Sequence, residues 1–310
     1  MIGIIGAGIS GLSLAWHLQQ KNVPYQVFEA SGRAGGCIRT RKENGYLMEE
    51  GPNSILADQQ AKEFIKAAGL GDRILPPEPV SKHRFIFKNG AYQKLPSSPP
   101  ALLMSSFFSL GTIWKIFREP SNKTRSTPGE TVGAFFERRF GKEIVELAVN
   151  PFVSGIYAGD PYQLQMDKTF PMLAEYEQKF GSVINGFIKN RKNAERKESF
   201  SFVEGMQELP AALARKISIR YNAPVKAVEP LEQGGFRLQL PDGEQDVTQL
   251  VLALPAFKAA ELLANFFPEV AASFNSVYYP PMATVHSVFK KETMQHPLDG
   301  FGGLNPKQSG

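Results

Sequence analysis

IGIIGAGISG, at residues 2–11, joins a strand to a glycine-rich turn. Its first four residues are apolar, as in a buried strand, and Gly6, Gly8 and Gly11 follow with the spacing G-x-G-x-x-G. The first two glycines let backbone N–H groups approach a pyrophosphate closely, and the third lets the next helix pack on the strand. The helix N-terminus adds the positive end of its dipole. The stretch predicts a dinucleotide site in an α/β, Rossmann-like fold; a purely structural glycine turn is the alternative.

Glu29 indicates which dinucleotide the turn accepts. It ends a second apolar run, at residues 23–28, and lies 18 residues after Gly11. A carboxylate at the tip of the second strand is placed to accept hydrogen bonds from a ribose diol. Because it would repel a 2′-phosphate, the sequence predicts FAD or NAD rather than NADP.

The following residues choose between flavin and nicotinamide. EASGRAGG, at residues 29–36, continues the motif, and EGPN follows at residues 50–53. Gly35 and Gly36 permit a backbone path closed to residues with side chains, beside the fixed cation of Arg33. This pattern resembles the extended fingerprint of the FAD-dependent amine oxidase and desaturase superfamily, which implies that Arg33 and the glycine pair wrap the flavin's phosphates and ribityl chain. An exposed arginine beside a flexible turn is the alternative.

Composition limits the other possibilities. At 310 residues the chain is long enough for two domains, and its single cysteine excludes an internal disulfide and fits a reducing compartment. The four histidines share no ligand spacing, so we expect no metal site. Because the first residues already form a strand, we expect no signal peptide and a cytoplasmic location.

The middle of the chain is basic and aromatic. Residues 78–200 carry 18 Lys and Arg against 12 Asp and Glu. This combination suits anionic lipid, an anionic substrate or nucleic acid, and we expect no nucleic acid because no recognition motif accompanies it. For residues 189–197, a solvated charge run is an equal alternative.

Residues 95–114 lack charge and raise the question of a transmembrane span. Prolines at positions 96, 99 and 100 and several serines argue against one. Only residues 101–114 could form a continuous helix, which is too short to span a bilayer. We therefore expect an interfacial helix and peripheral membrane contact.

Four segments are predicted to form two domains. Residues 1–77 and 201–256 are expected to form the FAD-binding domain. Residues 78–200 are expected to be a mainly helical domain for substrate and membrane association, with a hairpin around Asn89-Gly90. Residues 257–310 are expected to contribute an incomplete substrate-domain sheet.

Two further motifs carry a more specific resemblance. NPFVSGIYAGDP lies at residues 150–161, and EGMQELP lies at residues 204–210. Together with the N-terminal fingerprint, they resemble the protoporphyrinogen oxidase family of late haem synthesis. The oxygen-dependent coproporphyrinogen oxidases of the flavin type share these motifs. The resemblance extends over essentially the whole chain.

The resemblance implies specific contacts. FAD would contact Gly6, Ala7, Gly8, Ser10, Gly11, Glu29, Ala30, Arg33, Gly36, Cys37, Gly51, Pro52, Asn53 and Ser54, and Val225 would meet the adenine end through its backbone. Cys37 replaces a bulky aromatic common in the family, so its contact would be through the main chain. Arg84 would anchor a porphyrinogen propionate, and the backbone at Gly155 would face the tetrapyrrole. An exposed strand arginine and a turn glycine are the respective alternatives.

The implied activity is FAD-dependent oxidation of a porphyrinogen to a porphyrin, with hydride transfer to the flavin and molecular oxygen as acceptor. No side chain is predicted to act as a catalytic acid or base, because pyrrole protons can leave to solvent. Another flavin oxidase or desaturase, acting on amines or carotenoids, and a non-catalytic dinucleotide-binding fragment are the alternatives. The family pattern continues beyond residue 310, so we expect weak flavin binding. The sequence does not predict the oligomeric state.

Overall fold

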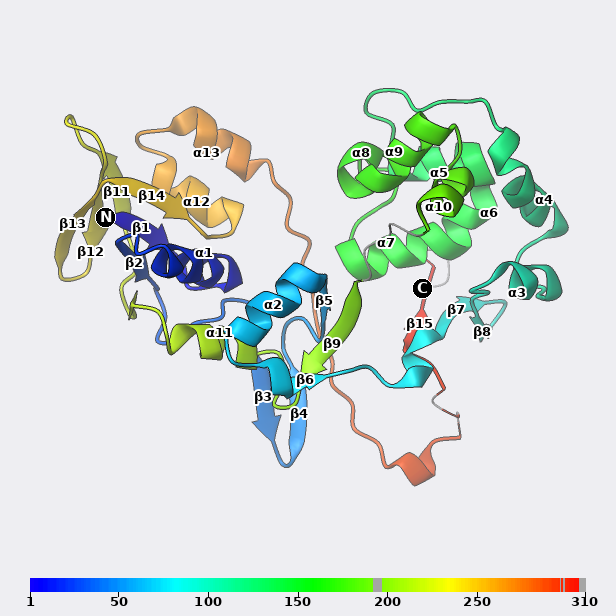
Figure 1. Ribbon diagram of the computed structural model, residues 1–310, viewed down its shortest axis with the longest axis horizontal. Coiled ribbons are helices and arrows are strands. Elements are labelled where there is room, and N and C mark those ends of the chain that lie inside the picture. Colours follow the sequence, from blue (N-terminus) through cyan, green and yellow to red (C-terminus); the bar gives the residue numbers. More distant parts are fainter. Residues whose placement is uncertain (192–196, 296, 298, 307–310) are drawn as a thin grey trace. The chain divides into compact units, whose positions relative to one another are not determined.

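The computed structural model describes residues 1–191, 197–295, 297 and 299–306. The chain forms two compact units (Figure 1). The first contains Met1–Pro77, Arg196–Tyr279 and Ala283–His286, and the second contains Glu78–Glu195, Pro280–Met282 and Ser287–Gly310.

A parallel sheet organises the first unit. Its strand order is β10-β2-β1-β14, formed by Ile219–Arg220, Tyr25–Phe28, Ile2–Ile5 and Gln249–Leu252. All three pairings are parallel. Because parallel neighbours need a crossover connection, helix α1 (Ile9–Gln20) links β1 to β2. β10 extends the sheet beside β2, and β14 extends it beside β1. The carboxyl ends of β1 and β2 therefore lie where Rossmann-like folds bind ligands.

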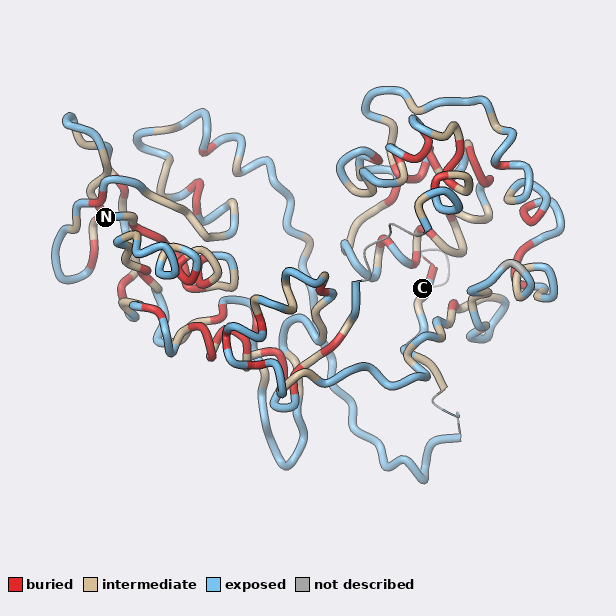
Figure 2. Tube along the Cα trace, in the orientation of Figure 1, coloured by how far each residue is buried: buried red, intermediate tan, exposed pale blue. Residues whose placement is uncertain are grey.

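The core of the first unit lies between this sheet and its helices. Ile4 on β1, Leu12 on α1 and Val27 on β2 are completely buried (Figure 2). They pack in one apolar cluster with Ile65 of α2 (Gln59–Ala67) and Leu213 of α11 (Glu208–Ala214). The apolar spacing of α1 therefore fixes its glycine-rich start against the sheet.

Other strands complete the first unit. β3 (Thr40–Glu43) and β4 (Tyr46–Glu49) form a hairpin. A second sheet pairs β5 and β6 with β9, and a third has the order β11-β12-β13. Their bounds are Ile55–Ala57 for β5, Ile74–Leu75 for β6, Glu198–Phe202 for β9, Ala227–Pro230 for β11, Phe236–Leu240 for β12 and Gly243–Val247 for β13.

The structure corrects the predicted boundary at residue 257. Helices α12 (Ala256–Leu263) and α13 (Pro268–Asn275) belong to the first unit, although residues 257–310 were expected to join the substrate-domain sheet. Leu262 packs with Val228 and Leu240 of the third sheet, which explains the attachment of α12.

The second unit is mainly helical, as expected. Its helices are α3 (Pro99–Met104), α4 (Leu110–Arg118), α5 (Val132–Phe140), α6 (Lys142–Ile144), α7 (Asn150–Tyr157), α8 (Met166–Thr169), α9 (Pro171–Phe180) and α10 (Val183–Asn190). A π-helical turn at Val145–Val149 joins α6 to α7. Short 3₁₀ turns lie at Gly71–Arg73 in the first unit and at Pro79–Lys82, Glu119–Ser121 and Lys291–Thr293 in the second.

The predicted hairpin is confirmed. β7 (Arg84–Lys88) pairs with β8 (Ala91–Lys94) around Asn89 and Gly90, whose φ angles of 54° and 81° fit a two-residue hairpin turn. β15 (Gly302–Leu304) adds to the other edge of β7 in parallel.

Residues 101–114, the longest stretch that could have formed one helix, are divided between two helices. Ser105 has an extended backbone after α3, and a new helix, α4, begins at Leu110 with Ser109 as its N-cap. The Thr112 N–H donates to Oγ of Ser109 over 3.3 Å, and this cap fixes the start of α4, separate from the end of α3 at Met104. Within the described part of the chain, each helix is too short or too polar to cross a bilayer.

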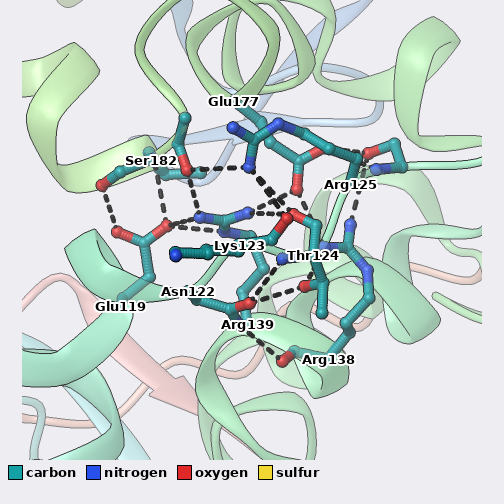
Figure 3. A network of polar contacts seen from close by, with 12 residues as sticks. Glu119, Asn122, Lys123, Thr124, Arg125, Arg138, Arg139, Glu177 and Ser182 are labelled. Carbon is teal, nitrogen blue, oxygen red and sulfur yellow. Dashed lines mark hydrogen bonds and ion pairs between the residues drawn. The ribbon is translucent and has the colours of Figure 1, made fainter.

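Charged side chains lie inside the helical unit (Figure 3). Arg139 of α5 bonds through Nε to Glu119 and through Nη1 to Glu177 of α9, each over 2.5 Å, and all three side chains are 0% exposed. Glu119 also accepts hydrogen bonds from the N–H groups of Val183 and Ile184, at the start of α10. This buried network therefore joins α5, α9 and α10.

Candidate functional site

The glycine turn after β1 is packed against its own fold at two of its three glycines. Gly6 has a φ of +105°, and a Cβ there would lie 2.6 Å from the carbonyl oxygen of Ala253. A Cβ on Gly11 would lie 2.0 Å from the carbonyl oxygen of Gly6. These glycines are required by the close packing of α1 and β14 around the turn.

Gly8 is different, because the space beside it is open. A Cβ on Gly8 would meet no atom of the described residues within 4 Å. Gly8 is also the N-cap of α1, and among the described side chains none caps that helix. The backbone N–H groups of the first helical turn therefore face an open surface, which is the geometry that suits a bound phosphate.

The Glu29 carboxylate lies at this junction. Its Oε2 accepts a hydrogen bond from the Ala7 N–H over 2.8 Å. Its Oε1 accepts from the N–H and Oγ of Ser31, over 2.9 and 2.7 Å. The acid predicted to hold a ribose thus extends from the end of β2 to the glycine turn.

The loop that carries Arg33 is fastened to the same turn. The Gly35 N–H donates to the carbonyl of Ala7 over 2.8 Å, and a Cβ on Gly36 would lie 3.3 Å from Cα of Gly8. Nη2 of Arg33 donates to the carbonyl of Gly36 over 2.8 Å. The guanidinium therefore holds its own loop in shape beside the cradle, and its contact with a phosphate stays a prediction.

The predicted loop at residues 51–54 lies against the loop at residues 29–37. A Cβ on Gly51 would lie only 2.1 Å from the carbonyl oxygen of Cys37, so the two backbones touch. Cys37, Pro52 and Asn53 are exposed and Ser54 is half-buried. The structure therefore brings the predicted segments at residues 6–11, 29–37 and 51–54 together in one unit.

Val225 follows a segment whose backbone is hydrogen-bonded to the loop of Glu29. The Ala223 N–H donates to the carbonyl of Glu29 over 2.9 Å, and the Asn222 N–H donates to the carbonyl of Ser31 over 3.1 Å. Tyr221 lies beside them: burial raises the pKa of its phenol, and the negative charge of Glu29 raises it further. Tyr221 and Asn222 carry no local signal of this position in the sequence, because the pairing of β10 with β2 brings them here.

Arg84 and Gly155 lie in the second unit. The exposed Arg84 guanidinium donates to the carbonyl of Ser81 and lies 4.1 Å from the ring centre of Phe301. Gly155 lies inside α7, where a Cβ would be 3.0 Å from Cδ2 of Leu304, so its alternative reading as a turn glycine is wrong. The turn residue is Ala158, with a φ of 47°.

Exposed apolar side chains on α7 were also missed. Phe152, Ile156 and Tyr157 are exposed, and the rings of Phe152 and Tyr157 lie 6.2 and 6.0 Å from that of Phe170. They give the helix of Gly155 an exposed apolar surface. The helical spacing of the motif could have indicated this surface. Among the described residues, no three His, Cys, Asp or Glu side chains are grouped so that they could hold a metal ion.

Comparison with known proteins identifies the family. The family model of flavin containing amine oxidoreductases matches residues 9–309. The chain belongs to this family. The predicted superfamily and the predicted flavin cofactor are therefore confirmed.

This flavin oxidoreductase is similar to several proteins named protoporphyrinogen oxidase. It is 32% identical to the mitochondrial protoporphyrinogen oxidase of Nicotiana tabacum, covering 99% of this chain and 68% of that protein. It is 33% identical to protoporphyrinogen oxidase 1 of Arabidopsis thaliana chloroplasts, covering 99% and 63%, and 29% identical to the human enzyme, covering 98% and 69%. The predicted resemblance to protoporphyrinogen oxidases is confirmed, and the chain spans between about 60 and 69% of such relatives.

Solved structures show the same fold. A proposed protoporphyrinogen oxidase from Exiguobacterium sp. 255-15 matches with a TM-score of 0.70 and 24% identity, over 87% of this chain and 62% of that one. Reduced UDP-galactopyranose mutase matches with a TM-score of 0.60 and 16% identity, over 90% and 61%. The Rossmann-like α/β fold of a flavoprotein is thus established for the first unit.

Proposed function

We propose that this flavin oxidoreductase oxidises a porphyrinogen to a porphyrin, with FAD in the cradle at Gly8 and Glu29. The observation that carries the proposal is the similarity to protoporphyrinogen oxidases over 98–99% of the chain. The open surface beside Gly8 supports it, because the fold leaves room there that no described side chain fills. We propose molecular oxygen as the acceptor and a cytoplasmic location.

The residues of the first unit would hold the cofactor at its phosphates and its ribose. The N–H groups at the start of α1 would donate to the pyrophosphate, and Glu29 would accept hydrogen bonds from the ribose hydroxyls. When bound, FAD supplies the two-electron acceptor for the oxidation. The protein's remaining task is to orient the substrate and exclude water, so we assign no catalytic acid or base.

Arg84 would recognise the substrate's propionate. Its guanidinium is exposed and bonds in this structure to backbone carbonyls and an aromatic ring. A carboxylate would gain a charge-assisted hydrogen bond there, which is stronger than the bond to a neutral carbonyl. Gly155, in the same unit, would present backbone among the apolar side chains of α7.

The direct test mixes the purified chain with excess FAD and protoporphyrinogen and records porphyrin fluorescence. We expect saturable binding of the added flavin and emission that rises above the rate without protein. Flavin binding without emission would favour another flavin oxidase, and neither signal would favour a non-catalytic fragment.

Arg84→Ala should raise the apparent KM for the porphyrinogen about tenfold with little change in kcat, because one charged hydrogen bond contributes about 1.5–3 kcal/mol. Lys94→Ala, which removes an exposed cation from the other strand of the hairpin, is the matched control. Equal KM values for Arg84→Ala and the unchanged protein would exclude the assigned role.

We also propose peripheral contact with an anionic membrane through α3 and α4. Met104 and Leu110 are 89% and 86% exposed, and Trp114 and Phe117 are more than half exposed. Arg118 stacks on Trp114, 4.5 Å from its ring centre, in the last turn of α4. Exposed apolar side chains beside cations are typical of interfacial helices.

Vesicles of phosphatidylglycerol should retain the chain, and Trp114→Ser with Phe117→Ser should lower the partition coefficient at least tenfold, because burying two aromatic side chains contributes about 3 kcal/mol or more. Ile188→Ser removes an exposed apolar side chain from α10 and serves as the control. Equal partition of both variants would show that α4 does not enter the interface.

A further inference from the structure

The β3–β4 hairpin begins and ends beside the predicted cofactor loops. Thr40 is the first residue of β3 and follows the loop of Cys37, whereas Glu49 is the last residue of β4 and precedes the loop of Gly51. Thr40 and Glu49 are direct partners in the strand register. Whatever holds this pair therefore also fixes where both loops leave the hairpin.

Three hydrogen bonds connect this pair to the EGMQELP motif, and a fourth joins the two side chains of the pair. Oγ1 of Thr40 donates to Oε2 of Glu49 over 2.7 Å, and the Met206 N–H donates to Oε1 of Glu49 over 2.8 Å. The Gln207 N–H donates to Oγ1 of Thr40, and the Thr40 N–H donates to Oε1 of Gln207, both over 3.1 Å. We call Thr40, Glu49, Met206 and Gln207 the hairpin clasp.

Gly205 is shaped to let the clasp form. Its φ is +94°, and a Cβ there would lie 2.4 Å from Cγ2 of Thr40 and 2.7 Å from Oε1 of Glu49. The backbone can therefore approach both side chains only because position 205 has no side chain of its own.

The clasp connects the hairpin to the helix that carries the phosphate cradle. Met206 is buried in the core cluster of the first unit, and α11, which starts at Glu208, packs against α1. The loop of Gly35 has its own hydrogen bond to the glycine turn, through Ala7. The loop at residues 51–54 packs at Gly51 against Cys37, and it follows directly from the end of β4, so its position depends on the hairpin.

We infer that Thr40 and Glu49 are positioning residues for the flavin part of the cofactor. They hold the loop at residues 51–54 in the place where it would meet FAD, and the EGMQ segment of the second motif serves this purpose. The inference rests on the proposed FAD binding. Neither side chain need touch the cofactor, since each acts through the backbone of the hairpin ends.

The test compares FAD with ADP, which carries the adenosine and pyrophosphate but no flavin. Thr40→Val keeps the shape of the side chain but removes two of the four hydrogen bonds. We expect its FAD affinity, measured by flavin fluorescence, to fall about tenfold, as for loss of roughly two net hydrogen bonds. Its ADP affinity, measured by calorimetry, should change less than about twofold.

Three controls make the outcome decisive. Thr40→Ser restores the hydroxyl and should recover most of the FAD affinity, and Glu49→Ala should reproduce the selective loss. Glu43→Ala removes an exposed acid whose ion pair lies within the same hairpin and should leave both affinities unchanged. An equal loss of ADP and FAD affinity in Thr40→Val, or unchanged FAD affinity, would overturn the inference. Failure of the unchanged protein to bind FAD would instead refute the proposed function.

Discussion

Arg139→Met should lower the free energy of unfolding of the helical unit by about 3–5 kcal/mol, because it leaves the buried carboxylate of Glu119 without its cation and removes one of the two arginines, Arg138 and Arg139, that bond to Glu177. The guanidinium bonds to Glu119 and Glu177, and all three side chains are 0% exposed. Its Nη2 also donates to the carbonyl of Gly181 over 2.9 Å. Methionine fills much of the same volume, so the loss comes mainly from the uncompensated charges rather than from a cavity.

The chain offers a clean spectroscopic measurement of this loss. It has two tryptophans, Trp16 in the first unit and Trp114 in the second. In a Trp16→Phe background, urea unfolding followed by tryptophan fluorescence reports on the helical unit alone. Lys179→Met breaks an exposed ion pair with Glu175 on α9 and should cost no more than about 0.5 kcal/mol. Similar losses for both variants would contradict the buried-charge account.

The free energy of unfolding should depend on pH through the buried carboxylates of this network. Burial raises the pKa of Glu177, but hydrogen bonds from Ser126, Arg138 and Arg139 outweigh it and hold the pKa below its ordinary value. The ionised carboxylate therefore stabilises the folded protein at neutral pH, and that contribution is lost as the pH falls through the lowered pKa. Without Arg139 a buried carboxylate favours protonation, so the difference between variant and unchanged protein should shrink from pH 7 to pH 5.

Local sequence signals predicted the parts of the fold whose causes lie within a few residues. The strand, glycine turn and helix at residues 2–20 follow from the G-x-G-x-x-G spacing, because each glycine meets backbone or open space within that same turn or at β14. The β7–β8 hairpin follows from Asn89-Gly90, whose positive φ angles few other residue pairs adopt readily. In the hairpin, and at Gly11 beside Gly6, the constraint and the residues that satisfy it are close in the sequence.

Contacts between distant segments escaped prediction. Thr40 and Gln207 are 167 positions apart, and neither residue type signals that the other is its partner. The pairing of β10 with β2 involves only Ile219 and Arg220, which is too short for any alternation to be visible. Such pairings are decided by the packing of the whole unit, so Tyr221 and Asn222 could not be assigned to the site beforehand.

The break between α3 and α4 has a local signal in the sequence, the serine at position 109. The absence of charge over residues 95–114 suggested one continuous element from 101 to 114. Ser109 is instead an N-cap, a role for which serine is strongly preferred, and the apolar residues after it start a separate helix. Local capping therefore outweighed average hydrophobicity in setting the helix bounds.

Gly8→Val should abolish most FAD binding while leaving the first unit folded. Gly8 has a φ of −70° and a ψ of 176°, an extended backbone that any residue adopts, and a Cβ there meets no described atom within 4 Å. The added side chain would stand where the phosphates must approach the helix N-terminus. Losing one or two charge-assisted hydrogen bonds at about 1.5–3 kcal/mol each lowers the affinity about 100-fold.

Gly11→Val is the contrasting variant, because its Cβ would lie 2.0 Å from the carbonyl oxygen of Gly6 and the turn cannot absorb that overlap. In a Trp114→Phe background, Trp16, a buried residue of α1, reports unfolding of the first unit in urea. We expect Gly8→Val to unfold at the same urea concentration as its parent and to fail in FAD titration, whereas Gly11→Val should lose both stability and binding. The two glycines would then have separate causes: one is kept free for the ligand, and the other is required by the fold. Full FAD affinity in a folded Gly8→Val protein would show that the cofactor's phosphates lie elsewhere.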